Sequence, residues 1–234
     1  EVYYQLEHCV RGIVSASESF DTPVISGNVS LYNETGNKSI YPTPVIGAVG
    51  LTENVSRHCD IAFKSVGDIV VLLGESTVTG YSSSLAGGEY LEVIHSLVAG
   101  QPSISIDKEL SVQAACRRLI IEGLAKSAHD CSDGGLAVAI VESAIQGKLG
   151  FGSTVEIEGR WDAVLFGEDQ SRIVVSINHD DLDLFSNVCE EYSVEWCVLG
   201  KVQLDRFSFS GLIDLPMSQL GEIWTQSLER MTGG

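Results

Sequence analysis

Apolar residues recur at helical spacing along residues 2–20 and predict an amphipathic helix there. The apolar positions are Val2, Leu6, Val10, Ile13 and Val14. Two apolar stretches follow at residues 23–32 and 44–49, and a turn-rich segment at residues 33–37 separates them. Apolar runs on both sides of a turn predict a strand, a turn and a second strand. One helix and two strands are too few to close a core, so residues 1–57 are expected to be the last part of a larger domain.

The pattern of residues 58–234 mixes strands and helices without a strict alternation. Strands are predicted at residues 68–74, 127–131, 155–157, 172–177 and 196–202. Helices are predicted at residues 109–125, 136–145 and 181–191. The first of these strands is apolar almost throughout, which is typical of a strand buried on both faces. A mixed order of elements predicts the α+β class for this domain.

Charge and composition narrow the classes of function. The chain has 14 Lys and Arg against 32 Asp and Glu, a net charge of −18, which argues against nucleic acid or an anionic membrane as partner. Its apolar runs are short and interrupted, and no signal peptide opens it, so no membrane span is predicted. Six cysteines without a C-x-x-C pair are expected to be reduced thiols and not a zinc site. These features predict a soluble cytoplasmic protein.

Small polar residues in the first apolar stretch are one candidate for chemistry. Gly27 allows the backbone to approach a ligand closely, and Asn28 and Ser30 offer neutral oxygens that suit Mg²⁺ or phosphate. A polar hairpin with an Asx turn is the alternative, and spacing alone favours it.

A glycine turn before the helix predicted at residues 136–145 is a second candidate. Gly134 and Gly135 expose backbone N–H groups at a helix start, where the helix dipole favours phosphate. The carboxylates of Asp130 and Asp133 oppose this unless Mg²⁺ intervenes. On the alternative interpretation, Ser132 or Asp133 caps the helix and the glycines only make a tight turn.

Two further segments contain groups that bind anions. The small residues at 82–90 offer backbone groups to an anion, and Gln170 and Arg172 offer donors to a ribose or a phosphate. A surface loop and an exposed turn explain these segments equally well.

Among the histidines, only His129 lies inside a candidate segment, the one that leads into the glycine turn at Gly134 and Gly135. A structural hydrogen-bonding role is the simplest interpretation of His129. No P-loop and no G-x-S-x-G elbow is present, which excludes classical P-loop kinases and serine hydrolases.

Four segments together resemble the phosphoribosylformylglycinamidine synthase family, in the family's order. They are SGNVSLYNE with IYPTPVIG at residues 26–47, LAGGEYL at 85–91, AHDCSDGGLAVAIVESAI at 128–145, and FGEDQSR at 166–172. The chain departs from the family in two places. It has Ala86-Gly87-Gly88 where the family usually has Gly-Gly-Ser, and Asp169 stands where a small residue is common.

The resemblance implies an ATP- and Mg²⁺-dependent C–N ligase of purine biosynthesis. The family converts formylglycinamide ribonucleotide to its amidine with ammonia from a glutamine amidotransferase subunit, and a small accessory subunit completes the complex. Its synthetase has two copies of an N-terminal-type and a C-terminal-type domain. Residues 1–57 resemble the end of an α/β N-terminal-type domain. Residues 58–234 resemble a complete α+β C-terminal-type domain of the aminoimidazole ribonucleotide synthetase-like fold.

The resemblance also implies roles for single residues. Gly27 would lie against ATP, Asn28 would ligate Mg²⁺ and Ser30 would contact the ribonucleotide. The catalytic histidine of the family lies upstream of the matched region, so no catalytic residue is expected in this chain and the chain alone is expected to be inactive. The turn at Asp133, Gly134 and Gly135, together with Gln170, belongs to the second copy and would form an auxiliary phosphate or nucleotide site.

Two alternatives stay open. One is another ATP-dependent synthetase of the same superfamily, although the SGNVS segment argues against it. The other is a non-catalytic half-domain that serves as a docking surface. Residues 1–55 are expected to self-associate or to be poorly ordered, because an incomplete set of strands around residues 23–52 exposes apolar faces and unpaired edges.

Overall fold

The computed structural model describes residues 2–30, 34–36, 38–153 and 155–233. The chain forms two compact units, Glu1–Asn54 and Val55–Gly234. Among the described residues, no helix is both long enough and apolar enough to cross a membrane.

The first unit contains one long helix and one short hairpin. Helix α1 spans Val2–Ser19, which confirms the predicted amphipathic helix. Strand β1 (Glu34–Thr35) pairs antiparallel with β2 (Lys38–Ser39). None of the described side chains in this unit is buried.

The two longer strands predicted for this unit are absent from its described residues. Residues 23–30 and 40–50 have no regular secondary structure and are exposed. The strand prediction is therefore wrong for these residues, while Leu31 and Tyr32 lie outside the described ones. A β-strand needs a neighbouring strand to satisfy its N–H and C=O groups, and apolar patterning alone does not supply one.

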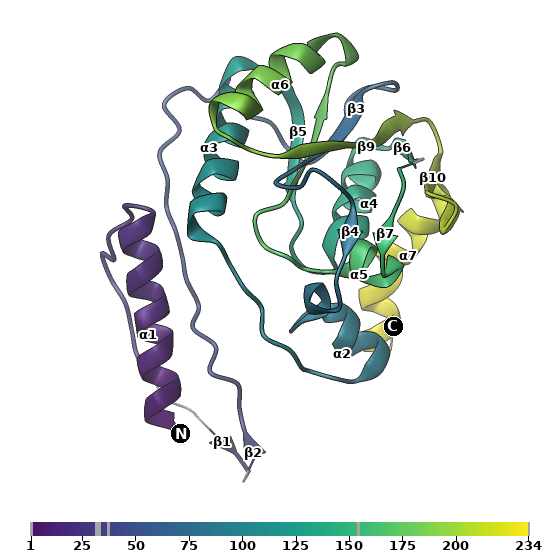
Figure 1. Cartoon of the computed structure of the whole chain (residues 1–234). Coiled ribbons are helices and arrows are strands. Elements are labelled where there is room, and N and C mark those ends of the chain that lie inside the picture. The colour runs from purple at the N-terminus through teal and green to yellow at the C-terminus, as the bar shows by residue number, and fades with distance from the viewer. Residues whose placement is uncertain (1, 31–33, 37, 154, 234) are drawn as a thin grey trace. The chain divides into compact units, whose positions relative to one another are not determined.

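A seven-stranded mixed sheet forms the centre of the second unit (Figure 1). Its strands, in spatial order, are β11 (Ile213–Pro216), β10 (Arg206–Phe209), β6 (Gly150–Ser153), β9 (Trp196–Gln203), β3 (Ile69–Leu73), β8 (Ile173–Ile177) and β5 (Ala125–Asp130). All neighbours in this sheet are antiparallel except β10 and β6. A parallel two-residue pair, β4 (Thr79–Gly80) with β7 (Glu158–Gly159), lies outside it.

Helices cover both faces of this sheet (Figure 1). Successive side chains of a strand point to opposite faces, and all five residues of β3 are buried. Val70 and Leu72 belong to one core cluster, and Ile69, Val71 and Leu73 belong to the other. The first cluster includes side chains of α4 (Gly135–Gly147) and α5 (Trp161–Phe166), and partly buried side chains of α7 (Met217–Thr232) pack against it. The second includes side chains of α3 (Ile106–Glu122) and α6 (Leu182–Glu191). This arrangement confirms the predicted α+β class.

Most predicted elements of the second unit are present within a few residues of their expected bounds. The strand predicted at residues 155–157 is wrong. There the Val155 N–H donates to the Ser153 hydroxyl at 3.2 Å, and the Val155 carbonyl accepts from the Ser210 hydroxyl at 2.6 Å. Side-chain hydroxyls thus replace a neighbouring strand as partners. The pattern also missed α2 (Glu89–His95), α5, α7 and the short helices η1 (Ser82–Leu85) and η2 (His179–Asp181).

Candidate functional site

Three of the four sequence motifs meet at the carboxylate of Glu168. Its Oε1 atom accepts the backbone N–H of Glu89 at 2.8 Å and the backbone N–H of Gly134 at 2.9 Å. The backbone N–H of Glu168 donates to the Ser84 carbonyl at 2.9 Å. Glu89 begins α2 and Gly134 is the N-cap of α4. One carboxylate therefore satisfies N–H groups at the starts of two helices, where negative charge is favourable.

Glycines allow the same motifs to pack backbone against backbone. A Cβ atom on Gly135 would lie 2.3 Å from the Gly167 carbonyl oxygen. A Cβ atom on Gly167 would lie 2.8 Å from the Ser84 Cβ, and one on Gly88 would lie 3.0 Å from the Glu168 carboxyl carbon. Gly135 also has φ +72°, a region that other residues adopt at a cost. These glycines are required by close packing between the motifs.

The glycine turn before α4 was predicted either to hold phosphate on free N–H groups or to follow a side-chain cap, and the structure shows neither free N–H groups nor a side-chain cap. Gly134 itself is the N-cap, and no side chain caps the helix, so the N-cap role considered for Ser132 or Asp133 is wrong. The N–H groups predicted to hold phosphate already have partners. That of Gly134 binds Glu168, and that of Gly135 donates to the Ser132 carbonyl at 2.9 Å. An anion at Gly134 must therefore displace the Glu168 carboxylate.

A hydrogen-bonded chain of side chains lies beside this turn. The Ser132 hydroxyl donates to the Asp130 carboxylate and holds the pKa of that carboxyl below its usual range, and His129 acts in the same direction. His129 Nε2 lies 2.9 Å from Glu142 Oε2, and its Nδ1 lies 3.3 Å from Asp130 Oδ1. Both nitrogens of His129 thus have structural partners, in agreement with the role expected from sequence.

A polar pocket of about 310 Å³ opens next to the Glu168 junction. It is lined by residues from three segments, 72–84, 103–108 and 169–172, together with Leu136 and Val164. Gln170 lines it, while Asp133, Gly134 and Gly135 do not. The structure therefore places Gln170 at a cavity and the other three predicted auxiliary residues beside it, at the start of α4.

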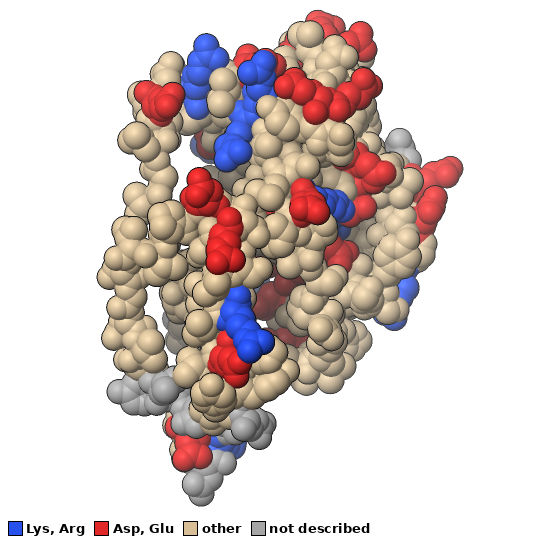
Figure 2. Space-filling view, turned by 60° about the vertical axis from the view of Figure 1, so that its left-hand side comes forward, with Lys and Arg blue, Asp and Glu red and all other residues tan. Residues whose placement is uncertain are grey.

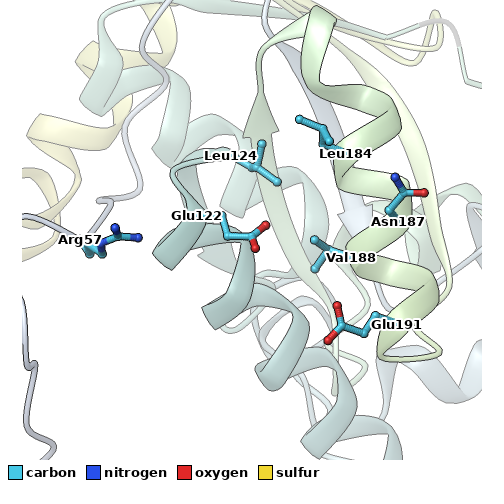
Figure 3. Close-up of a pocket in the computed structure, with 7 residues that line it drawn as sticks. All are labelled: Arg57, Glu122, Leu124, Leu184, Asn187, Val188 and Glu191. Atoms are coloured by element: carbon cyan, nitrogen blue, oxygen red, sulfur yellow. The ribbon is translucent and has the colours of Figure 1, made fainter.

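A larger and more open hollow of about 590 Å³ lies between the end of α3 and α6. Figure 3 shows the carboxylates of Glu122 and Glu191 directed toward the space between these helices. Glu122 forms an ion pair with Arg118 at 2.6 Å, and Arg57 donates to the Ile121 carbonyl. With two carboxylates in its lining, this hollow does not suit an anion.

Acidic side chains also dominate the face drawn in Figure 2, where the basic ones are few and scattered.

The predicted site residues of the first unit lie in an exposed segment without regular structure. Gly27, Asn28 and Ser30 are all exposed, and Asn28 Nδ2 donates to Ser30 Oγ at 3.4 Å. No Cβ neighbour crowds Gly27 within 4 Å. The amide oxygen of Asn28 is a hard neutral ligand of the kind that Mg²⁺ accepts. Within the part of the chain that the structure describes, no group of three or more His, Cys, Asp or Glu side chains is placed to hold a metal ion.

Sequence reasoning missed the role of Glu168. Its signal in the sequence is a single acidic residue directly after Gly167, in a segment where Gln170 and Arg172 are the expected ligand-binding residues. Glu89 and Gly134 are distant from Glu168 in sequence. Only the tertiary structure shows that their N–H groups both donate to the Glu168 carboxylate, where three motifs meet.

Replacing Glu168 by Ala is expected to lower the free energy of unfolding by about 2 kcal/mol, because two helix-start N–H groups lose a charged acceptor. Glu168→Gln keeps an acceptor oxygen and should cost less than half as much. Urea unfolding followed by circular dichroism measures both values. Equal stability of Glu168→Ala and the unmodified chain would show that water replaces the carboxylate without cost.

Comparison with known proteins places the chain in a family. Residues 65–209 match the family model described as AIR synthase related protein, C-terminal domain. The phosphoribosylformylglycinamidine synthase subunit PurL of Caldanaerobacter subterraneus is 41% identical over 229 residues. That of Anaeromyxobacter dehalogenans strain 2CP-C is 39% identical over 239 residues. These matches cover 96% and 97% of this chain but only 31% of each relative, and they fall in the C-terminal part of the relatives.

Solved structures share the fold. Thermotoga maritima PurL complexed with FGAR superposes with a TM-score of 0.57 at 18% identity, covering 71% of this chain and 30% of that one. The same protein complexed with ATP gives a TM-score of 0.54 at 17% identity, covering 71% of this chain and 28% of that one. Since the matching family model covers more than half of the residues, the chain belongs to the AIR synthase related proteins and carries their C-terminal domain.

Proposed function

We propose that the chain is the C-terminal part of a phosphoribosylformylglycinamidine synthase, an ATP-dependent C–N ligase. The observation that carries this proposal is the identity of 38–41% to relatives of that name over nearly the whole chain. The structure adds that three of the four motifs meet at Glu168 in one packed junction. The complete enzyme would act on formylglycinamide ribonucleotide (FGAR), ATP and ammonia.

In this proposal the residues of the first unit contribute to the working active site. Gly27 lies against ATP, Asn28 provides an oxygen ligand for Mg²⁺, and Ser30 contacts the ribonucleotide. Bound Mg²⁺ would neutralise phosphate oxygens during phosphoryl transfer, a reaction that depends mainly on positioning and charge neutralisation. The exposure of all three residues supports their availability to ligands.

The second unit provides an auxiliary phosphate or nucleotide site in this proposal. Its residues are Asp133, Gly134, Gly135 and Gln170. The bond between the Gly134 N–H and Glu168 makes direct occupation of the glycine turn costly, whereas Gln170 already lines a cavity. The cavity is therefore the favoured part of this site.

The proposed partners follow from the same assignment. A glutamine amidotransferase subunit would supply ammonia, and a small accessory subunit would complete the complex in the cytoplasm. Exposed apolar side chains in the first unit support contact with further protein, either upstream domains or a second copy of the chain. They are Val24, Ile25, Val29, Val45, Ile46, Val49 and Leu51.

The purified chain is expected not to consume ATP in the presence of FGAR, Mg²⁺ and ammonia, because the catalytic histidine implied for the family lies outside it. The matched control is the longer polypeptide that includes the upstream domains, assayed under the same conditions for ADP release. Sedimentation of the isolated chain in the same buffer reports whether its first unit self-associates. Steady turnover by the isolated chain would refute the proposal that it is only part of the catalytic unit.

A further inference from the structure

The hollow between the end of α3 and α6 combines apolar lining with carboxylates. Leu124 and Val188 are buried residues that line it, and Leu184 lines it while 54% exposed. Glu122 on α3 and Glu191 on α6 also line it, and Figure 3 shows both carboxylates directed toward the space between the two helices. The hollow therefore offers aliphatic surface with negative charge beside it.

The segment that carries α6 is acidic throughout. Residues 173–200 contain no Lys or Arg. Among the described residues, no cationic side chain lies within ion-pair distance of any acidic residue of this segment. Unpaired charges of one sign on one segment raise the local concentration of cations and of cationic partners. The acidic residues are Asp180, Asp181, Asp183, Glu190, Glu191 and Glu195.

Two arginines lie near the hollow without neutralising its α6 side. Arg118 pairs with Glu122 at 2.6 Å, and Arg57 donates to the Ile121 carbonyl at the end of α3. Figure 3 shows Arg57 on the α3 side of the hollow, away from Glu191. The Glu191 carboxylate therefore remains available to a cation from outside the second unit.

Aliphatic surface beside carboxylates matches the chemistry of Lys and Arg. Both side chains cover apolar surface with their stems and keep a cationic head in water. An amphipathic segment that lies in a groove between two helices brings an apolar anchor together with such heads. A second copy of the chain does not have this complementarity, because its net charge of −18 opposes approach to an acidic face.

We propose that the hollow between α3 and α6 docks a segment of another protein in which an apolar residue lies among Lys or Arg residues. The apolar residue covers Leu184, and the cationic heads lie beside Glu191 and Glu122. The hollow of about 590 Å³ has room for side chains of the docked segment. The side chains of α3 and α6 pack on the face of the sheet opposite α4, so this proposal does not depend on the proposed ligase function.

The test is fluorescence polarisation of the chain with a labelled helical peptide of Leu and Lys at amphipathic spacing. Saturable binding that weakens between about 0.1 M and about 1 M NaCl is expected. The same peptide with Glu in place of Lys should not bind, and the one with Ser in place of Leu should bind about tenfold more weakly or less. Absence of saturable binding by the Leu–Lys peptide up to millimolar concentration overturns the proposal.

Small polyamines provide the competing occupant. Spermidine has cationic groups on an alkyl chain but no larger apolar residue, so it should displace the labelled peptide at least tenfold less effectively than the unlabelled peptide does. Equal displacement by spermidine would show that the hollow is an amine site, and the docking proposal would then be wrong.

Variants with matched controls locate the bound peptide. Leu184→Ala should lower its affinity about tenfold, whereas Leu228→Ala, at an exposed leucine of α7, should leave it unchanged. Glu191→Gln should lower it about threefold, whereas Glu229→Gln, at an exposed glutamate of α7, should not. All four positions are exposed, so circular dichroism should show an unchanged fold.

Equal affinities of the Leu184→Ala and Leu228→Ala proteins for the peptide would overturn the location, and so would equal affinities of the two Gln variants. Sedimentation tests the second copy: self-association that Leu184→Ala abolishes and Leu228→Ala preserves would assign the hollow to another copy of this chain and refute the proposal. Turnover by the complete subunit is measured separately, so failure of docking and failure of the proposed ligase function are distinguishable.

Discussion

Gly135→Ala is expected to lower the free energy of unfolding of the second unit by about 3 kcal/mol or more. A Cβ atom at this position would lie 2.3 Å from the Gly167 carbonyl oxygen and 2.8 Å from the Phe166 carbonyl carbon. Both are backbone atoms, which do not rotate away as the end of a side chain does. The φ of +72° adds a second cost for any residue with a Cβ.

The matched control is Gly123→Ala. Gly123 has a similar φ of +77° and ends α3, but no atom lies within 4 Å of a Cβ built there. Its replacement should cost only about 1 kcal/mol, the conformational part of the effect. Urea unfolding followed by tryptophan fluorescence measures both variants, since Trp161, Trp196 and Trp224 all lie in the second unit. Equal destabilisation by the two substitutions would refute the close packing of the motifs as the cause.

Asn28→Ala in the complete subunit is expected to reduce turnover roughly a hundredfold or more, if its amide oxygen ligates Mg²⁺ as proposed. Loss of one transition-state contact to metal-bound phosphate costs a few kcal/mol, which corresponds to that factor. The stability of the protein should change little, because the side chain is exposed and its one hydrogen bond, to Ser30, is long at 3.4 Å. Steady-state kinetics with varied Mg²⁺, ATP and ribonucleotide measures the effect.

Two other substitutions distinguish the proposed sites. Ser30→Ala should weaken the apparent affinity for the ribonucleotide more than that for ATP. Asp133→Ala, in the turn before α4, should leave turnover nearly unchanged, because that turn is proposed to belong to the auxiliary site and not to the working active site. Full activity of Asn28→Ala together with loss of activity in a folded Asp133→Ala protein would reverse the assignment of the two sites.

The second unit was predictable where local pattern and tertiary environment agree. The run Ile69–Leu73 is apolar at every position, and the structure buries each of its side chains at the centre of the sheet. The helices α3, α4 and α6 were also predicted, α3 from apolar residues on one side and α4 from its small and aliphatic composition. The short helices α2 and α5 were missed, since seven and six residues are too few for a clear period.

The first unit shows the opposite case. Its helix was predicted from the spacing of Val2, Leu6 and Val10, a local property. The strands predicted at residues 23–32 and 44–49 were not formed in the described residues, because strand formation depends on a partner distant in sequence. The same apolar residues that predicted strands remain exposed there.

By itself the sequence determined the α+β class, the central buried strand, the helices α3, α4 and α6 and the order of the four motifs. All of these follow from residue types at fixed local spacing. Only the tertiary structure decided that the Glu168 carboxylate accepts the N–H of Gly134 and that Gly135 packs on Gly167. Both contacts join residues more than 30 positions apart in the chain. They arise from packing in three dimensions, which local sequence patterns do not encode.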